Sequence, residues 1–421
     1  MQRLRIAMKL IKTSLLSGIA SLVKIFTLLG INKVLAIYTG PSGYALIGQL
    51  QNAVQIFSTF ASGAVSTGVT KYTAEYGQDA LKQEKIWRTA FSIALSGSLI
   101  SAIFIIVFDK ELAEFFLGDR TYSNLFIVFA IGLLPMVVNT LLLAILNGKK
   151  EIKGYVIANI LGSLFSLLFT AVLAYCFDFL GALIALVSYQ SIACLFTLGV
   201  CLKTSWFRLG IFAFEFDRSA LRKLTGFTFM ALCSAICVPL SSLFIRTYLN
   251  DSLSAEAAGY WEAMTRLSGA YMMVVTMTLS VYYLPKLSEL TSASQIKHEV
   301  MSGYKIILPA AALLSLGVFI FRDLIIWILF TKEFAPMRPL FTWQLVGDTM
   351  KIGSWILSYL MVSRAMIKEF IISEIIFSIT LCLLVVVFSN AYGLIGATMG
   401  YCVNYMAYWV FLYFFVWRKI N

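Results

Sequence analysis

The chain has 421 residues, of which 60% are hydrophobic and only 13% charged, and its mean hydropathy is +0.86. A soluble globular domain is close to half apolar and a quarter charged, so this composition excludes that class. Apolar runs of about 20 residues recur along the chain, and each is long enough to cross a bilayer. The sequence therefore predicts an all-α polytopic membrane protein, because a membrane β-barrel would show short alternating segments instead.

Taken in chain order, the apolar runs predict twelve transmembrane helices. They lie near residues 13–37, 42–70, 89–108, 122–146, 155–175, 180–202, 224–249, 257–284, 304–322, 338–362, 370–389 and 394–417.

The net charge of +12 is distributed unevenly between the predicted loops. Lys and Arg are concentrated at both termini and in alternate loops such as 71–88 and 203–223. The opposite loops carry only Lys110, Arg120, Lys332 and Arg338. This is the positive-inside pattern, which predicts that both termini are cytoplasmic and argues against a nucleic-acid partner.

The chain also repeats itself at an offset of 215 residues. KKEIKGYVIANI (149–160) corresponds to RAMIKEFIISEI (364–375), and Gly181 coincides with Gly396. Six helices per half make this a parallel repeat, related by an axis along the membrane normal. The pattern predicts two six-helix lobes around a central cavity. The N-terminal lobe is residues 1–202, the cytoplasmic linker is 203–223 and the C-terminal lobe is 224–421.

A few charged residues lie deep within the predicted helices, where a charge normally faces a cavity or a partner. The deep bases are Lys24, Arg266 and Lys351, and the deep acids are Glu262 and Asp348. Local pairing is one interpretation, because Glu262–Arg266 and Asp348–Lys351 are each about one helical turn apart. Lys24 has no acid within a turn of its own helix. A net positive, water-filled cavity would suit an anionic group such as a phosphate.

Other polar residues in the helices have two interpretations each. Basic residues near helix ends are expected to reach the lipid headgroups, although the first two remain secondary candidates for a cavity or interface: Lys33, Arg246, Lys305 and Arg322. Amides of the second predicted helix suit either interhelical hydrogen bonds or contacts with sugars: Gln51, Asn52 and Gln55.

The sequence contains no P-loop, no HExxH or GxSxG motif and no Cys/His metal cluster. An enzyme would need its chemistry inside the helix bundle. We therefore expect no enzymatic activity, no cofactor and no metal.

Three segments closely resemble those of the Wzx flippases in the multidrug/oligosaccharidyl-lipid/polysaccharide (MOP) exporter superfamily. They are LFTWQLVGDTMKIGSW (340–355), SVYYLPKLSEL (280–290) and GVTKYTAEY (68–76). The likeness covers nearly the whole chain. It includes SLVK in the first helix, a turn with Gly40, Pro41 and Gly43, and RDLIIWILFTKEF (322–334).

The resemblance implies a V-shaped, MATE-like fold and a function. Wzx flippases move undecaprenyl-diphosphate-linked oligosaccharides from the inner to the outer leaflet of the bacterial inner membrane. The resemblance implies that Lys24, Arg266 and Lys351 hold the diphosphate during alternating access. Glu262 and Asp348 are candidates for a conformational switch coupled to H⁺ or Na⁺, because burial raises the pKa of an acid.

Within this family, the segment WEAMTRLSG (261–269) is more charged than in common-antigen members, which favours an O-antigen repeat unit as the substrate. The resemblance also implies two partners, an O-antigen polymerase and a chain-length regulator.

The sequence is also compatible with three other interpretations. A drug or cation exporter of the same superfamily would favour acids in the N-terminal cavity, where this sequence has Lys24. A membrane polymerase or glycosyltransferase would typically need a large periplasmic loop or catalytic acids. A structural partner in a glycan-assembly complex is a further alternative.

Overall fold

The computed structural model describes residues 2–77, 79–279, 283, 286–287, 290, 292–364 and 366–420. Side chains of residues 2–21, 225–228, 230–231, 277–278 and 417–420 are not described, so the basic N-terminus and most of SVYYLPKLSEL lie outside the described residues. Within the described part, eight helices are long and apolar enough to cross a membrane. The predicted all-α architecture therefore accords with the structure.

The described chain forms two compact units. The first comprises residues 1–38 and 50–235, and the second comprises 39–49 and 236–421. The lobe boundaries predicted from the sequence remain a prediction. The two units are defined by contacts within the chain, whereas the predicted lobes are defined by membrane spans.

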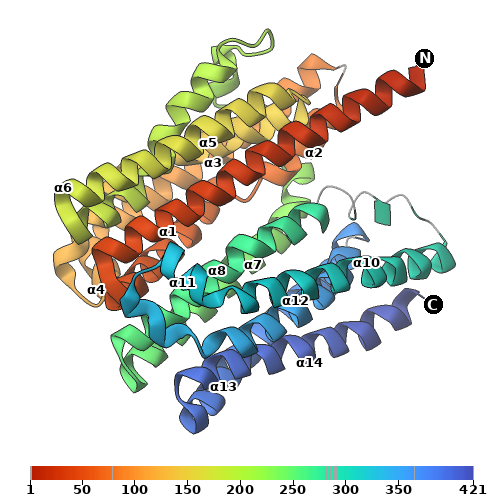
Figure 1. The fold of residues 1–421 in the computed structure, drawn as a ribbon. Helices are drawn as coiled ribbons and strands as arrows, with labels where there is room; N and C mark the ends of the chain where they lie inside the picture. Colours follow the sequence, from red (N-terminus) through yellow and green to blue (C-terminus); the bar gives the residue numbers. More distant parts are fainter. Residues whose placement is uncertain are drawn as a thin grey trace. The chain divides into compact units, whose positions relative to one another are not determined.

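The helices of the first unit pack around a core that includes Trp87, Phe91 and Ile145. They are α1 (Gln2–Ser62, apart from 39–49), α2 (Ser66–Glu75), α3 (Ala80–Val107), α4 (Asp109–Leu117), α5 (Ser123–Gly148), α6 (Ile152–Cys201) and the start of α7 (Arg218–Ser252), with η1 (Arg120–Tyr122) and η2 (Leu209–Phe212). In Figure 1, α3, α5 and α6 run side by side.

The second unit has its own core, which includes Leu279, Ile356 and Leu412. It holds the end of α7 (Arg218–Ser252), α8 (Ala255–Thr278), α10 (Ala293–Ile320), α11 (Arg322–Leu329), η4 (Lys332–Met337), α12 (Leu340–Ser363), α13 (Ile367–Tyr392) and α14 (Leu394–Ile420). Helix α12 packs against both α10 and α14, so its side chains are largely internal (Figure 1).

Several helix boundaries differ from the predicted ones. The first two predicted helices form one continuous element with a non-helical residue at Gly40, and α6 likewise joins two predicted helices across Phe177–Asp178. The predicted helix 42–70 is interrupted at Gly63 and Ala64, whose φ angles are 58° and 52°. The short helices α4 and α11 lie in segments predicted to be loops. The prediction missed them because it searched for runs long enough to span a membrane.

The repeat reappears in the backbone of the two units. Asp178 has φ 48° and ψ −131°, and Gly393, 215 residues later, has φ 58° and ψ −144°. A Cβ on Gly181 would lie 1.9 Å from the Leu173 carbonyl oxygen, and one on Gly396 would lie 2.0 Å from that of Phe388. Both units therefore make the same tight turn between two helices. Any side chain at Gly181 or Gly396, where the two helices of the turn come closest, would clash with the backbone.

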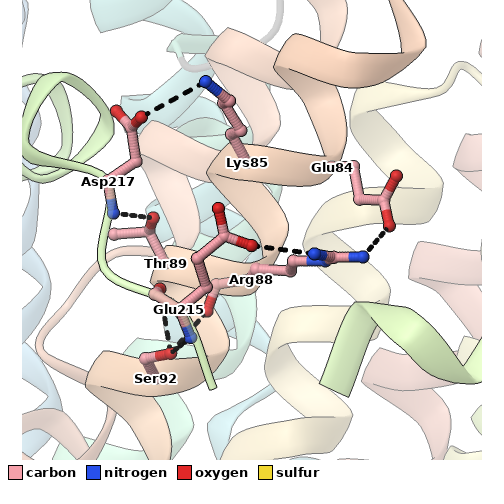
Figure 2. Close-up of polar contacts among 7 residues, drawn as sticks. All are labelled: Glu84, Lys85, Arg88, Thr89, Ser92, Glu215 and Asp217. Carbon is pink, nitrogen blue, oxygen red and sulfur yellow. Dashed lines mark hydrogen bonds and ion pairs between the residues drawn. The ribbon is translucent and has the colours of Figure 1, made fainter. Parts of the chain in front are cut away.

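The connection between α6 and α7 is fixed to α3 of the first unit. Its extended end turns Glu215 and Asp217 toward α3, as Figure 2 shows. Glu215 pairs with Arg88 at 2.8 Å, and its backbone N–H donates to the Ser92 hydroxyl at 2.8 Å. The Asp217 N–H donates to Thr89 Oγ1 at 3.1 Å. The end of this connecting segment is therefore held against α3 by specific polar contacts.

Asp217 also caps the first turn of α7. Its carboxylate accepts hydrogen bonds from the Ser219 hydroxyl and from the backbone N–H groups of Ser219 and Ala220. These bonds, the Ser219 hydroxyl foremost, lower the pKa of Asp217 to about 2. The cap is consequently ionised at all pH values well above that pKa.

We predict that Asp217→Ala lowers the free energy of unfolding by about 1 kcal/mol, the usual loss when a helix N-cap is removed. Thermal unfolding of the purified protein in detergent measures this change. Asp217→Asn, which keeps the acceptor oxygen, should restore most of the stability. Equal loss in both variants would show that the charge, and not the cap, matters.

Candidate functional site

A polar hollow of about 260 Å³ lies inside the first unit, between α1, α5 and α6. Lys24 and Thr27 of α1 line it together with Asn139 and Thr140 of α5. The α6 side contributes these polar residues: Asn159, Ser163, Ser166, Tyr189, Gln190 and Thr197. Such a density of hydroxyl and amide groups is unusual inside an apolar bundle, where polar groups mark functional pathways.

A second hollow of about 510 Å³ adjoins the first. Thr140, Tyr189 and Gln190 line both, so they form the junction between the two hollows. Gln51 and Gln55 line the larger hollow, together with hydroxyl groups from Ser58, Thr59, Ser62, Ser66 and Thr67. Gln55 also donates to Thr59 Oγ1 at 3.5 Å, and Asn52 is half-buried outside this lining.

Lys24 is the one charged side chain among the described residues that line these two hollows. Its ammonium group is exposed and has no ion-pair or hydrogen-bond partner within the described part of the chain. Lys33, half-buried on the same helix, lines neither hollow. The first unit therefore offers an anion one cation, surrounded by neutral hydrogen-bonding groups.

The second unit encloses a buried ion triad. Glu262 on α8 pairs with Arg266 at 2.7 Å and with Arg246 of α7 at 2.8 Å, and all three side chains are at most 9% exposed. The predicted Glu262–Arg266 pair is thus confirmed. Arg246, which we expected near the headgroups, is instead buried, because Glu262 neutralises it and the Trp261 ring lies 5.9 Å away.

Small residues allow this triad to form. Residues 39–49 of α1 pack against α8, and a Cβ on Gly48 would lie 2.4 Å from Cδ of Glu262. Gly259 similarly admits the backbone of Pro41. This approach places the Tyr44 ring 5.0 Å from the Arg266 guanidinium. The turn GPSG in the sequence therefore supports the charge cluster from a distant part of the chain.

Asp348 on α12 is fully buried and is held by hydroxyl groups, not by lysine. It accepts hydrogen bonds from Ser268 at 2.7 Å, from Tyr401 at 2.7 Å and from Tyr271. Gln344, one turn earlier, donates to it at 3.3 Å. The ion pairs of the described residues include none between Asp348 and Lys351, so the predicted pairing within α12 is wrong.

Lys351 instead points into a group of aromatic rings. Its ammonium group lies 4.7 Å from the centre of the Tyr405 ring, 5.3 Å from that of Trp355 and 5.4 Å from that of Tyr401. It also lines a hollow of about 130 Å³ whose lining includes Glu374 of α13. These cation–π contacts stabilise the charge of Lys351 without an ion pair to Asp348 on the same helix.

Sequence reasoning identified the charges but missed most of their partners. Ser268, Tyr271 and Tyr401 come from helices far apart in sequence, and no local spacing relates them to Asp348. Asn139 was overlooked as well, although an amide within the apolar run LLPMVVNTLLL was a visible signal.

The fold defines the class of protein. A MATE-family multidrug transporter of the MOP superfamily, in an inward-facing conformation, has a TM-score of 0.77 at 13% identity, covering 95% of this chain and 98% of its own. The lipid II flippase MurJ in an inward closed conformation has a TM-score of 0.72 at 13% identity, covering 97% and 90%. The chain thus has the fold of these membrane transporters.

Sequence likeness narrows the class to one family. The model of the polysaccharide biosynthesis protein family matches residues 10–291, and the chain belongs to this family. The lipid III flippases of Escherichia coli (strain K12) and Shigella flexneri are each 29% identical to it over 418 residues, covering 98% of this chain and 100% of theirs. The predicted resemblance to Wzx-type flippases is confirmed, and these relatives are transporters, not enzymes.

We predict that Glu262→Gln destabilises the protein by about 3–5 kcal/mol, because two buried guanidinium groups lose their counter-charge. Detergent-solubilised protein should show a strongly lowered melting temperature and poor yield. Glu256→Gln, at an exposed position in the first turn of the same helix, is the matched control and should cost at most about 1 kcal/mol. Wild-type stability of Glu262→Gln would mean that the triad contributes nothing.

A separate prediction concerns Gly347, the residue before Asp348. Helix α14 packs closely against α12 at this position. A Cβ there would lie 2.6 Å from the Tyr401 ring and 3.0 Å from the Cys402 Cα. We expect Gly347→Ala to cost about 1–3 kcal/mol of unfolding free energy through overpacking. Gly269→Ala has open space around it and should be neutral or stabilising. The same melting experiment measures both, and equal shifts would contradict the packing argument.

Proposed function

We propose that this protein translocates an undecaprenyl-diphosphate-linked oligosaccharide, the O-antigen repeat unit, from the cytoplasmic to the periplasmic leaflet. Family membership and the full-length likeness to lipid III flippases support the lipid-linked class of substrate. The charge pattern of WEAMTRLSG favours the O-antigen type. The protein would lie in the bacterial inner membrane with both termini cytoplasmic, as the distribution of basic loops indicates.

The observation that carries the proposal is the lining of the two adjoining hollows in the first unit. Lys24 supplies one cation for the diphosphate, and the hydroxyl and amide groups around it suit a glycan. A drug or cation exporter would need acids here, and the described lining of these hollows has none. The lining therefore favours the flippase over that alternative.

Twelve spans remain part of the proposal. The long helices α1 and α6 each exceed twice the length of one crossing and are interrupted at Gly40 and at Phe177–Asp178. Helices α8 and α12 carry Glu262 and Asp348, which lower their hydropathy without shortening them. Two lobes of six spans around a central cavity would then operate by alternating access.

The second unit would supply the conformational coupling. Glu262 and Asp348 are our candidates for a step driven by H⁺ or Na⁺, since a bound cation would change how tightly their donors are held. Arg266 and Lys351 remain candidates for contact with the diphosphate. In this structure Arg266 is committed to Glu262, so such a contact would require the triad to rearrange. An O-antigen polymerase and a chain-length regulator are the expected protein partners.

We predict that Lys24→Ala lowers translocation by about tenfold or more, because a hydrogen bond to a charged group contributes about 1.5–3 kcal/mol. Restoration of surface polysaccharide in a strain lacking this protein measures the effect, with membrane levels checked in parallel. Lys24→Arg should retain part of the activity. Lys110→Ala, at an exposed position outside the hollows, is the control. Full activity of Lys24→Ala would refute the diphosphate contact.

Purified protein in liposomes tests the function itself. A fluorescent undecaprenyl-diphosphate glycan should move between leaflets in a protein-dependent manner, and a pH or Na⁺ gradient should change its rate. Translocation that ignores both gradients would remove the coupling role of Glu262 and Asp348. Folded protein that moves no lipid-linked glycan would favour the drug-exporter alternative.

A further inference from the structure

Among the buried side-chain atoms without a hydrogen-bond partner in the described part of the chain, the amide oxygen of Asn139 is the one that belongs to the lining of the two hollows. Asn159, on the facing helix α6, donates from its amide to the Tyr155 carbonyl oxygen at 2.8 Å, one turn earlier. Asn139 makes no comparable bond to Pro135 one turn earlier on α5, and its buried Oδ1 has no hydrogen-bond partner among the described residues. A buried acceptor without a donor is unfavourable, and in the lining of a hollow a ligand can supply the missing donor.

The position of Asn139 relates it to Lys24. Both line the hollow of about 260 Å³, and Thr140, the next residue, belongs to the junction with the larger hollow. Tyr189 and Gln190 complete that junction, where the Gln190 amide donates to the Tyr189 hydroxyl at 2.8 Å. This bond orients the Gln190 side chain against Tyr189, whose ring also lines both hollows.

Covalent chemistry then decides which part of the ligand reaches the junction. In a polyprenyl-diphosphate glycan the first sugar is bonded directly to the phosphate. A diphosphate held by Lys24 therefore places this first sugar beside Asn139 and the junction, while later sugars extend into the hollow of about 510 Å³. The ring carbon next to the anomeric carbon carries the substituent nearest to the phosphate.

We propose that Asn139 is a specificity-determining residue that reads this substituent of the first sugar, with Tyr189 and Gln190 supporting the sugar ring. A primary amide offers a donor and an acceptor side by side. It is complementary to a substituent that offers the same pair, an acetamido group, and less so to a single hydroxyl. The inference rests on the proposed function and names the part of the substrate that the site recognises.

The experiment compares three fluorescent undecaprenyl-diphosphate disaccharides that differ at position 2 of the first sugar: acetamido, hydroxyl or hydrogen. Each is reconstituted with the full-length protein in liposomes, and the ratio of initial translocation rates is measured. The wild type should move the acetamido compound about tenfold faster than the deoxy compound, because a site built for a hydrogen bond rejects the analogue that lacks it. Ratios within one preparation do not depend on the amount of folded protein.

Asn139→Leu should bring this ratio close to one, and Asn139→Gln should recover part of it. Asn159→Leu is the matched control, because its amide lines the same hollow but is already bonded to Tyr155, and it should keep the wild-type ratio. Lys24→Ala should slow all three compounds by the same factor. The inference is overturned if Asn139→Leu keeps the wild-type ratio, or if the wild type does not discriminate. Failure to move any compound would instead refute the proposed function, and this inference with it.

Discussion

The structure is governed by the high free energy of an unpaired charge or hydrogen-bonding group in an apolar environment. The second unit meets this constraint completely for its acids. Glu262 is held between two arginines, and Asp348 receives three hydroxyl groups and an amide. These contacts tie α7, α8, α12 and α14 to one another, so the deep charges also hold the unit together.

The first unit treats the same constraint differently. Its hollows leave Lys24 and Asn139 without partners among the described residues, although both lie in helices that are otherwise apolar. Stability alone does not account for such groups, since any apolar side chain would be more favourable there. The two deep acids of the second unit are thus fully paired, whereas the polar groups that line the hollows of the first unit include a cation and a buried amide oxygen without partners among the described residues.

The two units differ in their polar side chains although they share the same backbone turn. The tight turns at Gly181 and Gly396 are equivalent, and so are the unusual backbone angles of Asp178 and Gly393. Side-chain chemistry has diverged on this common frame. Lys24 has no counterpart at the repeat position, which Pro239 occupies, and the acids of α8 and α12 belong to the second unit alone. One backbone plan thus carries different polar side chains in its two units.

Hydropathy, loop charges and the repeat by themselves determined that the chain is a helical membrane protein with two related halves, because these properties depend on residues close together in sequence. They also identified five deep charges, since a charge in an apolar run is conspicuous, but they misplaced Arg246. Only the tertiary structure decided the partners. Asp348 bonds to Tyr401 and not to Lys351, and Arg246 is buried and not at the headgroups, because helix packing brings together residues that no local spacing relates.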